Sequence, residues 1–205
     1  MYLIKTPWWL RALYPSFIWN INTNEKVLYL TFDDGPHETA TPFVLDELKK
    51  YDAKATFFCI GNNVVQHRSI YERILAEGHA VGNHTFNHLN GWKTKDEEYI
   101  NDIDKAAKEI DSTLFRPPYG RITRFQSSIV NRQSSIIMWD VLSGDFDTDL
   151  QPQRCLANVL YHSKKGSIIV FHDSSKAWER MSYCLPRLLE HFTEEGYQFK
   201  ALSVQ

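Results

Sequence analysis

The chain has 205 residues, of which 43% are hydrophobic and 23% charged, and its formal net charge is −2 at pH 7. This length fits one domain with a substantial core, which argues against both a disordered chain and a minimal scaffold. The nearly neutral charge gives no general reason to expect nucleic acid as a partner.

The first twenty residues are rich in aromatic side chains and form a lead to the rest of the chain. Lys5, Pro7, Arg11 and Pro15 interrupt the apolar run, so no cleavable signal peptide is recognised, and the segment is too short to span a membrane. Two interpretations remain open: the lead packs over one end of the domain, or it contacts a membrane surface peripherally. We therefore divide the chain into a lead, residues 1–20, and one domain, residues 21–205.

Strand-like apolar runs alternate with helical patterns from residue 27 onward. Strands are predicted at residues 27–32, 55–59, 79–82, 114–116, 135–139, 167–171 and 197–202. Helices are predicted at residues 42–51, 69–77, 95–112, 123–132, 153–161 and 183–195. This alternation indicates a parallel α/β architecture. A single-domain distorted (β/α) barrel with about seven strands fits the length better than a full eight-fold barrel, which takes about 250 residues.

Polar residues gather where the predicted strands end. They are Asp33, Asp34, Asn83, His84, Arg116, Asp140, Asp145 and His172. In parallel α/β barrels the active site lies at this carboxyl-terminal rim. The pattern therefore predicts that these side chains converge on one site.

Two of these clusters have the composition of a metal site. The first strand ends in Asp33-Asp34-Gly35-Pro36, and His84 and His88 stand four residues apart. On a helical turn, that spacing places both imidazoles on one face, where they can reach one cation. One carboxylate and two imidazoles leave positions open for water and substrate, and the second carboxylate can serve as a base. This is the equipment of a metal-dependent hydrolase.

Three further motifs each follow a predicted strand: Arg116-Pro117-Pro118-Tyr119-Gly120, Trp139 to Asp145, and Ser167 to Asp173. With all five clusters in this order, the sequence resembles the polysaccharide deacetylases of the NodB-homology type, carbohydrate esterase family 4. The resemblance runs from about Val27 to Leu202, and it implies that residues 21–205 are a deacetylase catalytic domain.

The resemblance implies a role for each motif residue near the cation. Asp34, His84 and His88 match the family's metal ligands, for one divalent ion. Such a donor set favours Zn²⁺ and also suits Co²⁺, Ni²⁺ or another first-row ion. Asp33 matches the catalytic base, and Arg116 would hold it ionised and oriented. Tyr119 lies where the family uses a backbone N–H to help hold the oxyanion.

The remaining roles concern proton donation and the acetyl group. His172 would protonate the leaving amine, supported by Asp145. Trp139 and the apolar pair Ile169 and Val170 would line an acetyl pocket, although core packing explains these three equally well. The motif departs from the family at Phe146, where Trp is common, and at residues 141–143, where a further Asp is common. Asp140 and Asp147 therefore compete with Asp145 for the support of His172.

The function expected from these residues is removal of N-acetyl groups from amino sugars in a polysaccharide, an oligosaccharide or a lipid-linked glycan. An amide hydrolase acting on a small non-carbohydrate C–N substrate is the alternative, and a glycan-binding module without turnover is a third class. The odd number of cysteines argues against a disulfide framework, and Cys59 and Cys184 are expected to be buried thiols. With no signal peptide recognised, we expect a cytoplasmic enzyme, peripheral to the inner face of the membrane if the lead is an anchor. The sequence leaves the oligomeric state open.

Overall fold

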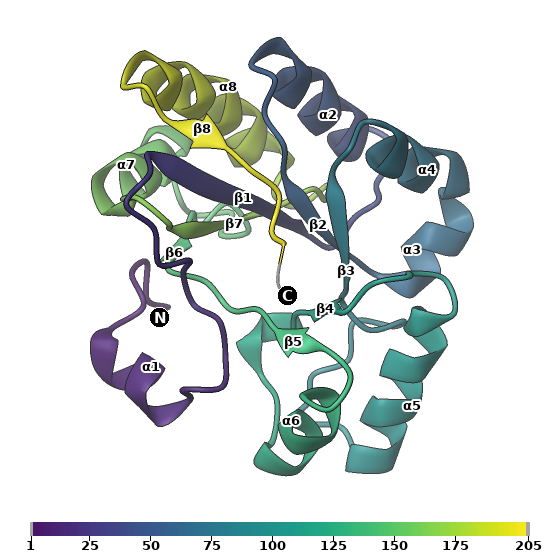
Figure 1. Ribbon diagram of the computed structural model, residues 1–205. Helices are drawn as coiled ribbons and strands as arrows, with labels where there is room; N and C mark the ends of the chain where they lie inside the picture. Colours follow the sequence, from purple (N-terminus) through teal and green to yellow (C-terminus); the bar gives the residue numbers. More distant parts are fainter. Residues whose placement is uncertain (1, 204–205) are drawn as a thin grey trace.

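The computed structural model describes residues 2–203, and strands alternate with helices through this part of the chain (Figure 1). The strands are β1 (Val27–Asp33), β2 (Thr56–Cys59), β3 (Ala80–Asn83), β4 (Leu114–Phe115), β5 (Ser135–Ile136), β6 (Val141–Leu142), β7 (Ile168–His172) and β8 (Gln198–Phe199). The helices are α1 (Trp8–Leu13), α2 (Ala40–Lys50), α3 (Gly61–Gln66), α4 (Arg68–Ala76), α5 (Asp96–Ala107), α6 (Arg124–Val130), α7 (Pro152–His162) and α8 (Trp178–Glu194). A short 3₁₀ turn, η1, covers Pro118–Gly120.

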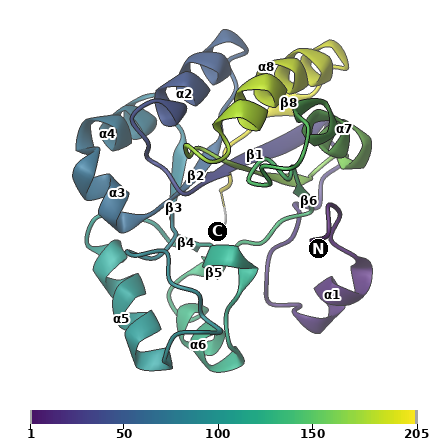
Figure 2. The ribbon, with the colours of Figure 1, turned by 180° about the vertical axis from the view of Figure 1, so that it is seen from behind.

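The strands form one curled parallel sheet with the helices on its outside (Figures 1 and 2). Along the sheet the order is β5-β4-β3-β2-β1-β7-β6, and β8 pairs with the beginning of β1. The predicted single-domain distorted (β/α) barrel with about seven parallel strands is therefore confirmed. The seven strands on this path include β6, which was not predicted, whereas the predicted strand near the C-terminus, β8, lies off it.

The predicted strand at residues 135–139 is in fact the beginning of a longer segment that changes neighbours. It pairs with β4 at Ser135 and Ile136, and then with β7 at Val141 and Leu142. Because only residues 137–140 separate the two pairings, this segment carries the chain across the open side of the curled sheet. Apolar alternation continues through such a segment, so the sequence pattern does not show where the partner changes.

The lead, residues 2–20 in the described structure, packs along this crossing segment. The Met138 N–H donates to Ile18 O at 2.7 Å, and the Leu142 N–H donates to Ile4 O at 2.8 Å. Phe17 and Trp19 are buried. Of the two interpretations of the lead, the structure therefore shows packing against the domain.

Side-chain alternation along β1 separates the core from the site. Leu30 and Phe32 pack beneath the outer helices, and the Phe32 ring stacks between Phe57 and Phe171 with centroid distances of 5.2 and 5.9 Å. Asp33 points to the other face, inside the barrel, because successive side chains of a strand face opposite ways. The register places Asp33 directly beside His172 of β7.

Two further predictions concern the rest of the chain. Cys59 and Cys184 are buried free thiols, as predicted, and Cys155 is buried too. Among residues 2–203, no helix combines the length and the apolarity needed to cross a bilayer.

Candidate active site

A cavity of about 720 Å³ opens at the carboxyl-terminal rim of the barrel. Its lining combines polar residues from several strand ends, namely Asp33, Asp34, His84, His88 and His172. These residues come from β1, β7 and the loop after β3, so the barrel topology brings together motifs that lie far apart in the sequence.

Asp34, His84 and His88 form a cluster with one donor atom each, and these atoms all lie within 4.8 Å of one another. The distance from Asp34 Oδ1 is 3.2 Å to His88 Nε2 and 3.7 Å to His84 Nε2. Asp34 Oδ1 is buried and accepts no hydrogen bond of good geometry from the described residues. A buried carboxylate oxygen facing two imidazole nitrogens fits a divalent cation, which would satisfy all three donors.

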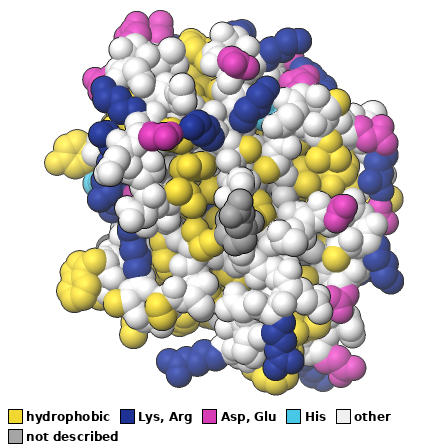
Figure 3. All heavy atoms as spheres, viewed as in Figure 1, with side chains coloured by type: hydrophobic (Ala, Val, Ile, Leu, Met, Phe, Trp, Pro, Cys, Tyr) yellow, Lys and Arg dark blue, Asp and Glu magenta, His cyan; other side chains and the backbone are white. Residues whose placement is uncertain are grey.

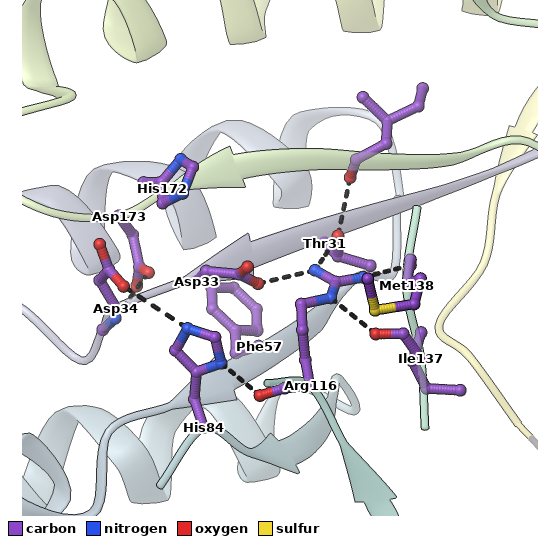
Figure 4. A network of polar contacts seen from close by, with 12 residues as sticks. Thr31, Asp33, Asp34, Phe57, His84, Arg116, Ile137, Met138, His172 and Asp173 are labelled. Atoms are coloured by element: carbon purple, nitrogen blue, oxygen red, sulfur yellow. Dashed lines mark hydrogen bonds and ion pairs between the residues drawn. The ribbon is translucent and has the colours of Figure 1, made fainter. Parts of the chain in front are cut away.

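The tautomer of His84 also suits a metal ligand (Figure 4). His84 Nδ1 lies 2.7 Å from Arg116 O. Because a carbonyl oxygen can only accept, Nδ1 carries the proton, and the Nε2 lone pair faces Asp34.

Residues 84–88 do not form the helical turn on which the four-residue spacing would place both imidazoles on one face. β3 ends at Asn83, and Thr85 and His88 have φ values of 63° and 57°, in the left-handed region. Side chains hold the backbone of this loop: Asn83 Oδ1 accepts the Thr85 N–H, and Asp102 Oδ2 accepts the N–H groups of the next two residues. The imidazoles therefore converge through an irregular loop rather than through the face of a helix.

Local electrostatics favour the protonation states that bind a cation. Burial by itself raises the pKa of Asp34, but the neighbouring His88, His172 and His84 outweigh burial and hold it well below its usual range. Burial lowers the pKa of His84 to about 4, against the opposing charge of Asp33. At neutral pH Asp34 is thus ionised and His84 is neutral, as cation binding requires.

Asp33 faces a different partner, the buried guanidinium of Arg116 (Figure 4). Arg116 Nη1 donates to Asp33 Oδ1 and to Thr31 Oγ1, both at 2.7 Å. Its other nitrogens donate to Ile137 O and Met138 O at 3.2 and 3.0 Å. Arg116 is fully buried, so this contact is not an ordinary surface ion pair. Its fixed guanidinium orients the Asp33 carboxylate.

Asp145 holds His172 by accepting two hydrogen bonds from it. Asp145 Oδ1 lies 2.7 Å from His172 Nδ1, and Oδ2 accepts the His172 N–H at 2.7 Å. Burial acts to lower the pKa of His172, but the charge and hydrogen bond of Asp145 raise it to about 10. The imidazole is therefore protonated at neutral pH.

The two competing carboxylates make other contacts. Asp140 is fully buried and accepts from Lys5 Nζ and Ser167 Oγ, each at 2.6 Å, and it also pairs with Arg11. Asp147 accepts from the Tyr2 hydroxyl at 2.8 Å. Asp140 was expected at the rim with the other polar residues, but it lies beneath the lead. Of the three carboxylates, Asp145 is the one that contacts His172.

Residues expected on the substrate side divide into two groups. Tyr119, Trp139 and Val170 line the cavity, and the Tyr119 ring lies 4.6 Å from the His88 ring between centroids. Ile169 does not line it: its side chain is fully buried in the core beneath the outer helices. Of the two interpretations left open for Ile169, pocket lining and core packing, the structure shows core packing, because adjacent residues of β7 face opposite sides of the sheet.

Sequence reasoning assigned no role to Asp173, which is fully buried beside the turn after β1. It accepts the Gly35 N–H at 3.0 Å and the Thr41 hydroxyl at 2.5 Å. A Cβ at position 35 would lie 2.0 Å from Asp173 Oδ2, so this turn requires glycine. Burial raises the pKa of Asp173 to about 8. Because Asp173 follows His172 in the chain, the sequence indicates that it lies near the site. The sequence does not indicate that its carboxylate holds the turn after β1.

Comparison with known sequences gives a consistent result. A family model described as polysaccharide deacetylase matches residues 20–134. A peptidoglycan-N-acetylglucosamine deacetylase of Bacillus cereus is 34% identical over 192 residues, which cover 90% of each chain. A chitooligosaccharide deacetylase of Azorhizobium caulinodans is 34% identical over 161 residues, covering 75% of this chain and 76% of that one.

Solved structures show the same likeness. The Bc1960 peptidoglycan N-acetylglucosamine deacetylase, in complex with 4-naphthalen-1-yl-N-oxidanyl-benzamide, superposes with a TM-score of 0.88 at 31% identity, covering 96% of this chain and 95% of that one. BA3943 of Bacillus anthracis, a CE4 family pseudoenzyme, reaches 0.81 at 26% identity, covering 94% and 69%. Since a pseudoenzyme shares the fold, any inference of activity depends on the side chains of the site.

Proposed function

The chain belongs to the polysaccharide deacetylase family, and from this premise we propose that it is a metal-dependent hydrolase of N-acetylated amino sugars. The reaction cleaves the acetamide C–N bond with water and yields acetate and a free amine. The observation that supports it most is the gathering of three separate functions around one cavity: a cation cluster, a carboxylate held by arginine, and a protonated imidazole.

Asp34, His84 and His88 would hold the cation. Two imidazoles with one carboxylate suit Zn²⁺, and other first-row ions fit the same donors. When bound, the ion supplies Lewis-acid polarisation of the amide carbonyl and favours the ionisation of water.

Asp33 and His172 would move the protons. Asp33 accepts a proton from the attacking water, while Arg116 keeps its carboxylate oriented at 2.7 Å. His172 donates a proton to the nitrogen of the leaving amine, and Asp145 aims the ring. The backbone N–H of Tyr119 would stabilise the developing oxyanion.

The experiment compares substrates with the purified, zinc-loaded protein. Chitooligosaccharides, peptidoglycan fragments and lipid-linked amino sugars are incubated separately, and released acetate is measured. We expect acetate from at least one N-acetylated sugar, and an unchanged rate in the exposed control Asp149→Asn. Hydrolysis of small non-carbohydrate amides without any release from these sugars would favour the alternative function.

A further inference from the structure

The lead contributes a wall to the active-site cavity. The lead residues that line the same cavity as Asp33 and Asp34 are Tyr2, Leu3, Thr6, Pro7, Leu10 and Trp19. This wall comes from the segment that packs along residues 135–142, so it lies beside the site because of how the barrel closes.

The polar donors of this wall are already engaged. The Tyr2 hydroxyl donates to Asp147, and the Thr6 hydroxyl donates to Trp139 O at 2.7 Å. The Trp19 indole N–H donates to Tyr14 O at 3.2 Å. Among the described lead residues that line the cavity, the side chains therefore offer a substrate mainly apolar surface. Such a wall suits a hydrocarbon or aryl group better than sugar hydroxyls, which require hydrogen-bond partners.

The lead also carries apolar side chains that are exposed to solvent. Leu3 lines the cavity and is also 53% exposed, and Trp8, Trp9 and Leu13 of α1 are 79%, 49% and 61% exposed. Figure 3 shows hydrophobic side chains projecting at the lower left, where Figure 1 places α1. Exposed apolar side chains gathered on one short segment mark a binding surface.

The wall is fixed to the barrel. Thr6 N–H donates to Asp140 O at 3.0 Å, and the buried Asp140 carboxylate binds both Lys5 and Arg11. These contacts also engage the two cations that an interfacial anchor would offer to anionic lipid. The lead is therefore better suited to receiving an apolar group from the cavity side than to electrostatic attachment to a membrane.

We propose that the lead forms a subsite for an apolar aglycone. The substrate class is then an N-acetylated amino sugar joined to an apolar group, which lies along Leu3 and α1 while the acetamide reaches Asp33. This inference rests on the proposed deacetylase function and specifies its substrate.

The test compares the methyl and octyl β-glycosides of N-acetylglucosamine, both below the micellar concentration of the octyl glycoside. We expect kcat/KM to be at least about tenfold higher for the octyl glycoside, because burial of several methylenes contributes that much. Leu3→Ser should reduce this preference severalfold, because it removes apolar surface that the octyl chain contacts and the methyl group does not reach. Leu75→Ser, at a 45% exposed leucine of α4, is the matched control.

Equal kcat/KM for the two glycosides, or a preference that Leu3→Ser leaves intact, would overturn the inference. If neither glycoside is hydrolysed, acetate release from chitooligosaccharides and peptidoglycan fragments decides whether the proposed function fails too, and tryptophan fluorescence then measures binding of the two glycosides. Tighter binding of the octyl glycoside that weakens in Leu3→Ser supports the subsite, and equal binding overturns it. A different result would assign the surface to membrane contact instead. The native protein would then sediment with substrate-free liposomes, Leu3→Ser would not, and kcat/KM would be equal for the two glycosides.

Discussion

Asp33 and Asp34 are adjacent in the chain but face different partners. Asp33 ends β1 and meets Arg116, whereas Asp34 leaves the strand with a φ of 80° and faces His84 and His88. The left-handed backbone at Asp34 turns its carboxylate away from that of its neighbour. The structure thus gives the proposed proton acceptor and the proposed cation ligand different partners within two consecutive residues.

This separation predicts different losses in two variants. Asp33→Asn should retain stoichiometric zinc and lose turnover, because only the base is removed. In Asp34→Asn the affinity for zinc should fall by about tenfold or more, because a neutral amide replaces a charged donor. Elemental analysis after dialysis measures the metal, and acetate release measures turnover. Equal loss of zinc from both variants would refute the base role of Asp33.

The His172–Asp145 pair predicts a pH dependence of stability in the metal-free protein. The folded-state pKa of His172, about 10, lies above the ordinary 6.5. The pair therefore stabilises the fold fully below about pH 6.5, and this contribution is lost as the pH rises toward 10. Urea denaturation should show that the stability advantage of the native protein over Asp145→Asn shrinks between pH 6 and pH 10. An advantage that grows over this range would contradict the assigned protonation.

Most of the proposed site residues could be identified from the sequence because each stands in a motif at the end of an apolar strand. Asp145 was distinguished from Asp140 and Asp147 only by its contact with His172. The same limit applies to Asp173, since its contact with Gly35 depends on the packing of β7 against β1. Sequence motifs indicate which residues gather, and packing decides which atoms meet.

Asp173 links the turn after β1 to helix α2 through two hydrogen bonds. Asp173→Ala would leave the Gly35 N–H and the Thr41 hydroxyl without their acceptor and loosen the turn that carries Asp34. We expect zinc affinity to fall about 10–100-fold, as for other groups that orient metal ligands. Competition with a chromophoric chelator measures the affinity, and circular dichroism verifies the fold. Thr41→Ser, which keeps the hydroxyl, is the control, and unchanged affinity in Asp173→Ala would contradict this role.

The lead depends on the buried Asp140. Asp140→Ala removes the carboxylate that pairs with Lys5 and Arg11. We therefore expect the free energy of unfolding to fall by about 3–5 kcal/mol. Trypsin should then cleave the lead faster, because Lys5 and Arg11 are released. Asp149→Asn is the matched control. Wild-type stability and proteolysis in Asp140→Ala would show that the lead is held by other contacts.

Elements were predictable where a buried apolar run ends in polar residues. Strands β1, β2, β3 and β7 lie within one residue of their predicted ends, because each is buried between two neighbours. Helices α1 and α3 were not predicted, and each is only six residues long, too short for a clear helical period. The break between β5 and β6 depends on the pairing partner, which local patterns do not contain.

The segment that closes the barrel also helps to form the cavity. The segment from β5 to β6 crosses the open side of the sheet, and the lead packs along it and lines the cavity.

Membrane contact of the lead and the cytoplasmic location of the protein stay predictions. Deleting residues 1–20 should lower the melting temperature, because Phe17 and Trp19 are buried. An unchanged melting temperature with lost liposome binding would instead support an anchor.

Acetate release from an N-acetylated oligosaccharide tests the metal-dependent deacetylase activity. It is measured for the zinc-loaded protein, the chelator-treated protein and zinc-loaded Asp33→Asn. We expect one acetate for each new amine from the zinc-loaded protein, none above background after chelation, and recovery when zinc is returned. Asp33→Asn should be slower by about 10²–10⁴-fold with its zinc retained. Equal rates with and without metal would refute the metal dependence, and an Asp33→Asn variant as active as the native protein would refute the base role of Asp33.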